Sequence, residues 1–178
     1  MTKTFGRKDL RVIKTRRSLR EAMAALLERR PFKHITVNDL CEEALMSRAA
    51  FYAHFYDKYD LLEYYLGGVA GEYLVAKTDT ADAIAGLIAG TQRVRIRNIL
   101  ISADSETAEI VNKFIASLVN AAPDDGSPVD PARALLIDFW VGGIIQFIMR
   151  QTAATLSLGN KDQFVKLMRH FAELKKVL

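Results

Sequence analysis

Basic and aromatic side chains alternate in residues 45–62, LMSRAAFYAHFYDKYDLL, and these residue types are common at nucleic-acid interfaces. The stretch holds five aromatic rings, although aromatic residues are only 9% of the chain, and Arg48, His54 and Lys58 lie among them. A guanidinium can donate two hydrogen bonds to one guanine in the major groove of DNA, and other polar side chains suit phosphate oxygens. The stretch is therefore expected to serve as a binding surface, as core packing, or as both.

Two short helices are predicted to carry these side chains, over residues 36–44 and 47–55. Thr36 is the expected N-cap of the first helix, and Asp39, three residues later, can complete a capping box with it. Ser47 is the expected N-cap of the second helix, and only about two residues separate the pair. This spacing is typical of a helix-turn-helix motif, in which the N-terminal residues of the second helix enter the major groove.

The aromatic side chains of the second short helix divide between two faces. Arg48 and Tyr52 are four residues apart and share one face, and Phe51 and Phe55 share the adjacent face by the same spacing. We expect the two phenylalanines to pack against Leu40 and the first helix of the chain. Tyr52 is then left beside Arg48 on the outward side, so that one face is core and the other is a binding surface.

Longer helices are expected on both sides of this pair. Residues 9–29 form the first, with Asp9 as a candidate N-cap and Pro31 ending it. Asp57 is the expected N-cap of the other, which reaches about residue 77. The apolar residues that repeat at helical spacing along the first helix are Leu10, Ile13, Leu19, Met23, Leu26 and Leu27.

Helical periodicity also covers the rest of the chain, and no segment alternates in polarity long enough to predict a strand. The fold is therefore expected to be all-α. Ser105 is expected to open one of the remaining helices. These helices are predicted at residues 80–101, 105–122, 131–154 and 161–177.

Positive charge is concentrated at the N-terminal end of the chain. The net charge is only +4, but residues 1–20 contain eight Lys and Arg against one acidic residue. A basic end on a nearly neutral body favours a polyanionic partner, with nucleic acid ahead of an anionic membrane surface. A solvated basic tail is the alternative for residues 1–8.

Other classes of function are not indicated. Cys41 is the only cysteine, which excludes an intramolecular disulfide and a multi-cysteine zinc site and favours a core residue over a redox sensor. The longest apolar region, 134–149, contains Asp138 and Gln146 and is too short for a membrane span. There is no catalytic motif, metal-ligand spacing or phosphate-binding glycine loop. We therefore expect no enzyme, no metal and no cofactor, and a cytoplasmic location.

Residues 9–62 resemble the DNA-binding domain of the TetR (tetracycline-repressor-like) family of transcriptional regulators. The segment ITVNDLCEEALMSRAAFYAHFYDKYDLL has the family's Thr-Val pair, two helices, a Ser, a Phe/Tyr pair, His-Phe, and a Lys before Leu-Leu. The resemblance implies a helix-turn-helix domain over 1–58, with its motif at about 36–55, and a larger helical regulatory and dimerisation domain over 59–178. It also implies a homodimeric repressor that releases operator DNA when a small-molecule effector binds. A helical adaptor that binds no DNA is the competing hypothesis.

The matched positions provide the candidate DNA contacts. Arg48 is the expected reader of bases, and Ala49 is placed to touch a thymine methyl group. Tyr52, His54 and Lys58 are expected to contact phosphates. A solvated arginine, a partly buried histidine and a plain surface lysine are the respective alternatives for the three basic side chains. The full set of candidates is Thr36, Val37, Arg48, Ala49, Ala50, Tyr52, His54 and Lys58.

Two positions depart from the family's pattern. Leu45 stands where a glycine is common in the turn, and a positive φ at that position would strain a leucine. Ala50 stands where the family often has a threonine, whose hydroxyl can bond a phosphate.

Paired glycines mark the predicted dimer interface. Gly142 and Gly143 interrupt a strongly apolar helix, at a cost of about 1 kcal/mol each against alanine, which close approach of another helix would offset. The resemblance implies that the helices at 131–154 and 161–177 pack against their copies in a second subunit. Ordinary packing within one chain is the alternative.

Overall fold

The computed structural model describes residues 7–76, 93–101 and 104–119, together with positions 135, 139, 142, 143 and 166. Within these residues every regular element is a helix and no strand occurs. In chain order the elements are α1 (Arg7–Arg29), the 3-10 helix η1 (Phe32–His34), α2 (Val37–Glu43), α3 (Arg48–Tyr52), α4 (Lys58–Ala76), α6 (Arg93–Leu100) and α7 (Ser105–Val119). The predicted all-α fold, with a helix-turn-helix domain at its N-terminal end, is confirmed.

Some predicted helices can be compared with the structure only in part. The first half of the helix at 80–101 lies outside the described residues, and its second half is α6. Most of the helices at 131–154 and 161–177 also lie outside them.

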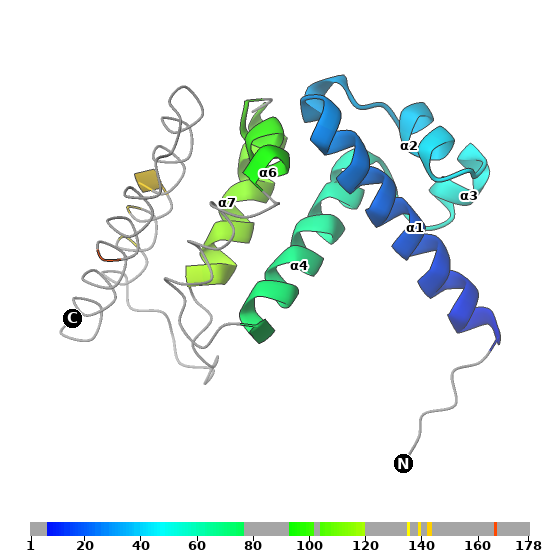
Figure 1. Ribbon diagram of the computed structural model, residues 1–178, viewed down its shortest axis with the longest axis horizontal. Coiled ribbons are helices and arrows are strands. Elements are labelled where there is room, and N and C mark those ends of the chain that lie inside the picture. Colours follow the sequence, from blue (N-terminus) through cyan, green and yellow to red (C-terminus); the bar gives the residue numbers. More distant parts are fainter. Residues whose placement is uncertain are drawn as a thin grey trace, which may run out of the picture.

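The helices pack on two sides of α1. Helices α2 and α3 lie on one side, whereas α4, α6 and α7 lie on the other (Figure 1). One cluster of buried apolar side chains joins both groups, from Phe51 in α3 to Ile99 in α6 and Phe114 in α7. Cys41 belongs to this cluster, and burial raises the pKa of its thiol. Because packing is continuous across the start of α4, the domain boundary after residue 58 stays a prediction.

The N-terminal half of α1 extends beyond the other helices (Figure 1). Since α1 already includes Arg7, Asp9 lies within the helix, and its assignment as the N-cap was wrong. Leu10 and Ile13 are 47% and 49% exposed, so the predicted apolar stripe reaches the core only from Leu19 onward. The physical reason is that the helices packed against α1 cover its C-terminal half and leave the first turns open to solvent.

Helices α4 and α7 are capped by aspartates that lie close together. The predicted cap of α4 is confirmed, since Asp57 Oδ1 accepts a hydrogen bond from the backbone N–H of Tyr59 at 2.8 Å. Helix α7 begins at Ser105, as predicted, and it is capped by Asp104, whose Oδ1 accepts from the backbone N–H of Thr107 at 2.8 Å. The Tyr59 hydroxyl donates to Asp104 Oδ2 at 2.8 Å, and this bond is the main reason that the pKa of Tyr59 rises to about 12. The first turns of the two helices are thereby tied together.

Leu45, in the turn between α2 and α3, has a left-handed backbone conformation with φ at 53°. Two backbone hydrogen bonds close the turn: Leu45 N–H donates to Glu42 O at 3.1 Å, and Met46 N–H donates to Cys41 O at 2.9 Å. This is the Schellman arrangement, which ends a helix with a left-handed residue that is usually glycine. The positive φ that the family's glycine suggested at this position is therefore present.

Replacement of Leu45 by glycine should raise the free energy of unfolding by up to about 1 kcal/mol. The left-handed conformation costs a residue with a Cβ about 1–2 kcal/mol, and the added freedom of glycine in the unfolded chain offsets about half of that. The side chain is 94% exposed, so its removal loses little packing. Urea unfolding measures the change. Leu45→Ala is the control, and a glycine variant no more stable than the alanine variant would contradict the explanation.

Candidate nucleic-acid interface

Helix α3, the second helix of the pair, is shorter than predicted. It spans Arg48–Tyr52, and the chain turns at residues 53 and 54, whereas the sequence indicated a helix over 47–55. The predicted cap is present, since Ser47 Oγ accepts a hydrogen bond from the backbone N–H of Ala50 at 3.2 Å. Ala49 is exposed next to Arg48 in the first turn, and Ala50 is half-buried.

The division of the aromatic side chains between two faces is confirmed. Phe51 and Phe55 are buried, with 0% and 3% exposure, and their ring centroids lie 6.0 Å apart. Tyr52 is 49% exposed on the opposite side, with its ring edge-on to Phe51. The phenylalanines therefore hold α3 on the core while Tyr52 and Arg48 face solvent.

Arg48 is held between two helices by hydrogen bonds. Its Nη1 donates to Asn38 Oδ1 on α2 at 3.1 Å, and its Nη2 donates to the Tyr52 hydroxyl at 3.2 Å. The guanidinium carbon also lies 5.7 Å from the centre of the Tyr52 ring. Asn38 was not among the residues predicted from the sequence, which contains no local signal for a contact ten residues away. The structure thus brings Asn38, Arg48 and Tyr52 together into one exposed polar cluster.

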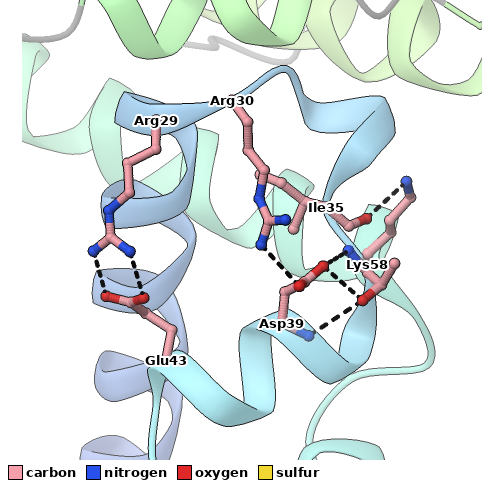
Figure 2. A network of polar contacts seen from close by, with 7 residues as sticks. Arg29, Arg30, Ile35, Asp39, Glu43 and Lys58 are labelled. Atoms are coloured by element: carbon pink, nitrogen blue, oxygen red, sulfur yellow. Dashed lines mark hydrogen bonds and ion pairs between the residues drawn. The ribbon is translucent and has the colours of Figure 1, made fainter.

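Thr36 acts as the predicted N-cap of α2. Its Oγ1 accepts from the backbone N–H of Asp39 at 3.2 Å, and Asp39 Oδ2 accepts from the backbone N–H of Thr36 at 2.8 Å. Arg30 pairs with the other oxygen of this carboxylate at 2.8 Å, as Figure 2 shows. The hydrogen bonds with Thr36 are the main reason that the pKa of Asp39 lies below its usual range. Val37, the next candidate, is half-buried against the core.

A second ion pair fixes α2 to the end of α1. Both terminal nitrogens of Arg29 donate to the carboxylate of Glu43, at 2.8 and 2.9 Å (Figure 2). Bidentate pairs of this kind restrain geometry more than single contacts do. With the Arg30–Asp39 pair at its other end, α2 is attached at one terminus to α1 and at the other to the residue that follows α1.

Lys58 is directed inward, toward the connection between α1 and α2. Its Nζ lies 3.1 Å from the carbonyl oxygen of Ile35, 3.4 Å from that of Phe32 and 3.5 Å from that of Lys33. It also lies 4.6 and 5.3 Å from the ring centres of Phe32 and Tyr59. Burial lowers the pKa of this ammonium. Figure 2 shows the contact with Ile35. A phosphate contact by Lys58 stays a prediction, and it would compete with these three carbonyl groups.

His54 follows α3 and is half-buried. Its backbone carbonyl accepts a hydrogen bond from Arg16 Nη2 of α1 at 3.4 Å, and the Arg16 guanidinium lies 5.2 Å from the Phe55 ring centre and 5.3 Å from that of Tyr64. Arg16 therefore supports the C-terminal end of α3, a role with no signal in the sequence. A phosphate contact by His54 stays a prediction.

Exposed basic side chains continue along the N-terminal half of α1. They are Arg11, Lys14 and Arg17. Arg17 pairs with Glu21, but both partners are largely exposed, so this ion pair is weak. Among the described residues, no group of His, Cys, Asp and Glu is arranged to hold a metal ion. In the same part of the chain, no helix combines the length and apolar character needed to cross a membrane.

Comparison with known proteins gives one family and a shared fold. Residues 19–65 match the family model for bacterial regulatory proteins of the tetR family. No curated protein matches the sequence. A TetR transcriptional regulator from Streptococcus agalactiae 2603V is similar in structure, with a TM-score of 0.63, 17% identity, and coverage of 90% of this chain and 96% of that one. The dihydroxyacetone kinase operon activator DhaS is also similar, with a TM-score of 0.59, 16% identity, and coverage of 91% and 98%. At these identities the likeness of the structures shows the fold.

Proposed function

Since this chain is a DNA-binding transcriptional regulator of the tetR family, we propose that it acts as a homodimeric repressor that binds operator DNA through α3 and releases it when a small molecule occupies the C-terminal domain. DNA binding and regulation of transcription follow from membership of this family. The sign of regulation, the effector, the dimer and the residues that contact DNA are our proposal. Its target also makes the cytoplasm the proposed location.

The observation that carries the DNA-binding site is the exposed polar cluster at the start of α3. Arg48 occupies the first turn of the second helix of the motif, where side chains reach base edges. Ala49 lies beside it and is small enough to let the helix approach a thymine methyl group. Tyr52, His54 and Lys58 remain the proposed contacts to phosphates of the DNA backbone. Thr36, Val37 and Ala50 remain candidate DNA contacts.

Binding to DNA should weaken steeply as salt concentration rises. Each phosphate neutralised by a Lys or Arg releases condensed counterions, which gives a slope of about −0.9 in log affinity against log salt for each contact. Fluorescence anisotropy with a randomised duplex, from about 50 to 200 mM salt, measures this slope. Absence of binding at the lowest salt would favour the helical adaptor over the regulator.

The sign of regulation can be tested with a reporter gene under a promoter that the protein selects from genomic fragments. Repression predicts low expression with the protein present and recovery when the effector is added. One of the two similar structures is that of a protein named as an activator. Expression that is lower without the protein than with it would therefore show that the protein activates transcription and does not repress it.

The proposed dimer is supported by the described positions of the predicted helix at 131–154. Leu135 and Phe139 are 71% and 72% exposed, and together with Gly142 and Gly143 they have the spacing of one helix face. Among the described residues, no atom lies within 4 Å of a Cβ atom built at either glycine. Space at the two glycines is consistent with close approach of a second copy, which is the contact that we propose.

Replacement of Gly143 by phenylalanine should weaken the dimer by about 1–3 kcal/mol, the range expected when extra volume is forced into a close contact. Sedimentation equilibrium of wild type and variant measures the change. Gly67→Phe is the matched control, because Gly67 in α4 is also exposed and has no atom within 4 Å of a Cβ position. A wild-type protein that is monomeric at micromolar concentration would contradict the proposed dimer.

A further inference from the structure

We propose that Asn38 of α2 is a positioning residue that orients Arg48 and limits this part of the interface to reading hydrogen-bond acceptors, so that it selects guanine. The proposal rests on the proposed DNA-binding role of α3. In this proposal α2 also contributes to sequence recognition, because Asn38 on α2 contacts Arg48 and not the DNA.

The hydrogen-bond directions in the cluster follow from the chemistry of arginine. A guanidinium has five N–H donors and no acceptor, so the atom of Asn38 that faces Arg48 Nη1 must be the carbonyl oxygen. The Tyr52 hydroxyl must accept from Arg48 Nη2 for the same reason. The hydrogens that remain free on the cluster belong to the amide nitrogen of Asn38, the hydroxyl of Tyr52 and the guanidinium. The Asn38 oxygen and the Tyr52 hydroxyl each keep some acceptor capacity, but the guanidinium can only donate, so the cluster presents mainly donors.

A surface of donors discriminates among the bases in the major groove. Guanine offers two adjacent acceptors, N7 and O6, whereas adenine places an amino donor beside N7 and cytosine presents an amino donor. An asparagine that reads adenine needs its own carbonyl oxygen for the adenine amino group. In Asn38 one lone pair of that oxygen already accepts from Arg48, so an adenine amino group would have to share the oxygen with the guanidinium. Asn38 is therefore better placed to support the reading of guanine by Arg48 than to read adenine itself.

Asn38 can restrain Arg48 because α2 is itself restrained. The capping box between Thr36 and Asp39 includes the turn that carries Asn38, and ion pairs to Arg29 and Arg30 hold the two ends of the helix. A free arginine side chain loses much rotamer entropy when it is immobilised on a base, and a side chain already held in place loses less. Loss of the restraint should therefore lower the affinity for guanine-containing sites more than the affinity for random DNA.

The test begins with selection of binding sites from a randomised duplex library by the wild-type protein. The guanine position read by Arg48 is identified as the one that becomes degenerate with Arg48→Ala. Asn38→Ala, Asn38→Asp and the double variant Asn38→Ala/Arg48→Ala are then compared on the selected site and on random duplex at one salt concentration. Asn112→Ala is the matched control, because Asn112 is an exposed asparagine on α7. Alanine has the higher helix propensity, so the substitution in α2 should not unfold the protein, and thermal unfolding verifies this.

Asn38→Ala should reduce the preference for the selected site over random DNA by about 2- to 12-fold, the loss expected from freeing one side chain. Asn38→Asp keeps an acceptor for Arg48, so it should retain the preference for guanine while binding all DNA more weakly through its charge. The double variant should show no further loss of preference beyond Arg48→Ala, because the effect of Asn38 acts through Arg48. The control variant should match wild type.

Equal losses on the two DNAs for Asn38→Ala, or a loss of preference that persists in the Arg48→Ala background, would overturn the role of Asn38 while leaving DNA binding intact. Selection of adenine at the position read by Arg48 would overturn the proposed preference for guanine. Absence of any selected site for both wild type and Asn112→Ala would overturn the DNA-binding proposal and this inference together.

Discussion

Replacement of Lys58 by methionine should lower the free energy of unfolding by about 1–3 kcal/mol, the cost of leaving partly buried carbonyl groups without a donor. Methionine keeps most of the length of the side chain over the Phe32 and Tyr59 rings but removes the ammonium. The carbonyl oxygens of Phe32, Lys33 and Ile35 then lose the group that connects them to α4. Some of the loss is offset because the half-buried charge, whose pKa is lowered by burial, no longer has to be desolvated.

Urea unfolding of the variant measures this effect. Lys113→Met provides the control, since Lys113 forms an exposed pair with Glu109 and its loss should change stability by less than about 0.5 kcal/mol. Equal stabilities of the two variants would show that the carbonyl contacts contribute little. The salt dependence of DNA binding tests whether Lys58 also contacts a phosphate. A slope of log affinity against log salt that is smaller by about one in Lys58→Ala would show this contact.

The parts of the fold that depend on neighbouring residues could be predicted from the sequence. Thr36 and Asp39 form the expected capping box, and Ser47 and Asp57 cap α3 and α4 as expected. The placement of Phe51 and Tyr52 on adjacent faces of the helix, one buried and one exposed, agrees with the prediction from helix geometry. In each case the cause lies within about four residues of the effect, a distance at which helical spacing and capping chemistry decide the outcome.

Contacts between distant segments could not be predicted in the same way. Asn98 is buried, and its Nδ2 donates to the carbonyl of Leu27 at 2.8 Å, which satisfies a carbonyl group near the C-terminal end of α1. The apolar spacing of Leu10 is the same as that of the core residues, yet Leu10 is exposed because no helix lies over that turn. Periodicity identifies a face of a helix, and only the arrangement of the other helices determines how much of that face is covered.

The candidate interface shows the same contrast. The exposure of Arg48 and Tyr52 was predicted from their positions on α3, but the contact of Arg48 with Asn38 depends on how α2 and α3 cross. Lys58 was interpreted from its position in the family's pattern, and that pattern contains no information on where its ammonium is directed. The place of a residue in the motif therefore indicated that the residue has a role, and the structure was needed to identify its contacts.

Replacement of Arg48 by alanine should cost about 1–3 kcal/mol of binding free energy on the selected operator, as expected for one bidentate contact to guanine. The loss on random DNA should be smaller, because only one positive charge is removed there. Ala49 and Ala50 carry no polar side-chain group, so Arg48 provides the strongest donor in the first turn of α3. Tyr52 has a single hydroxyl, which already accepts from Arg48. We therefore expect the sequence preference of α3 to depend mainly on this one guanidinium.

Binding of wild type and Arg48→Ala to both DNAs at a single salt concentration measures the difference. Arg17→Ala is the control for charge, because Arg17 is an exposed arginine on α1 whose loss should affect the two DNAs alike. The expected result for Arg48→Ala is an operator affinity that falls about 5- to 150-fold with a smaller fall on random DNA, whereas Arg17→Ala should leave the ratio of the two affinities unchanged. Equal losses on both DNAs would make Arg48 one positive charge among several. Specificity would then have to come from the shape of the DNA or from the basic N-terminal residues, since these are the remaining means of reading a sequence without base contacts from α3.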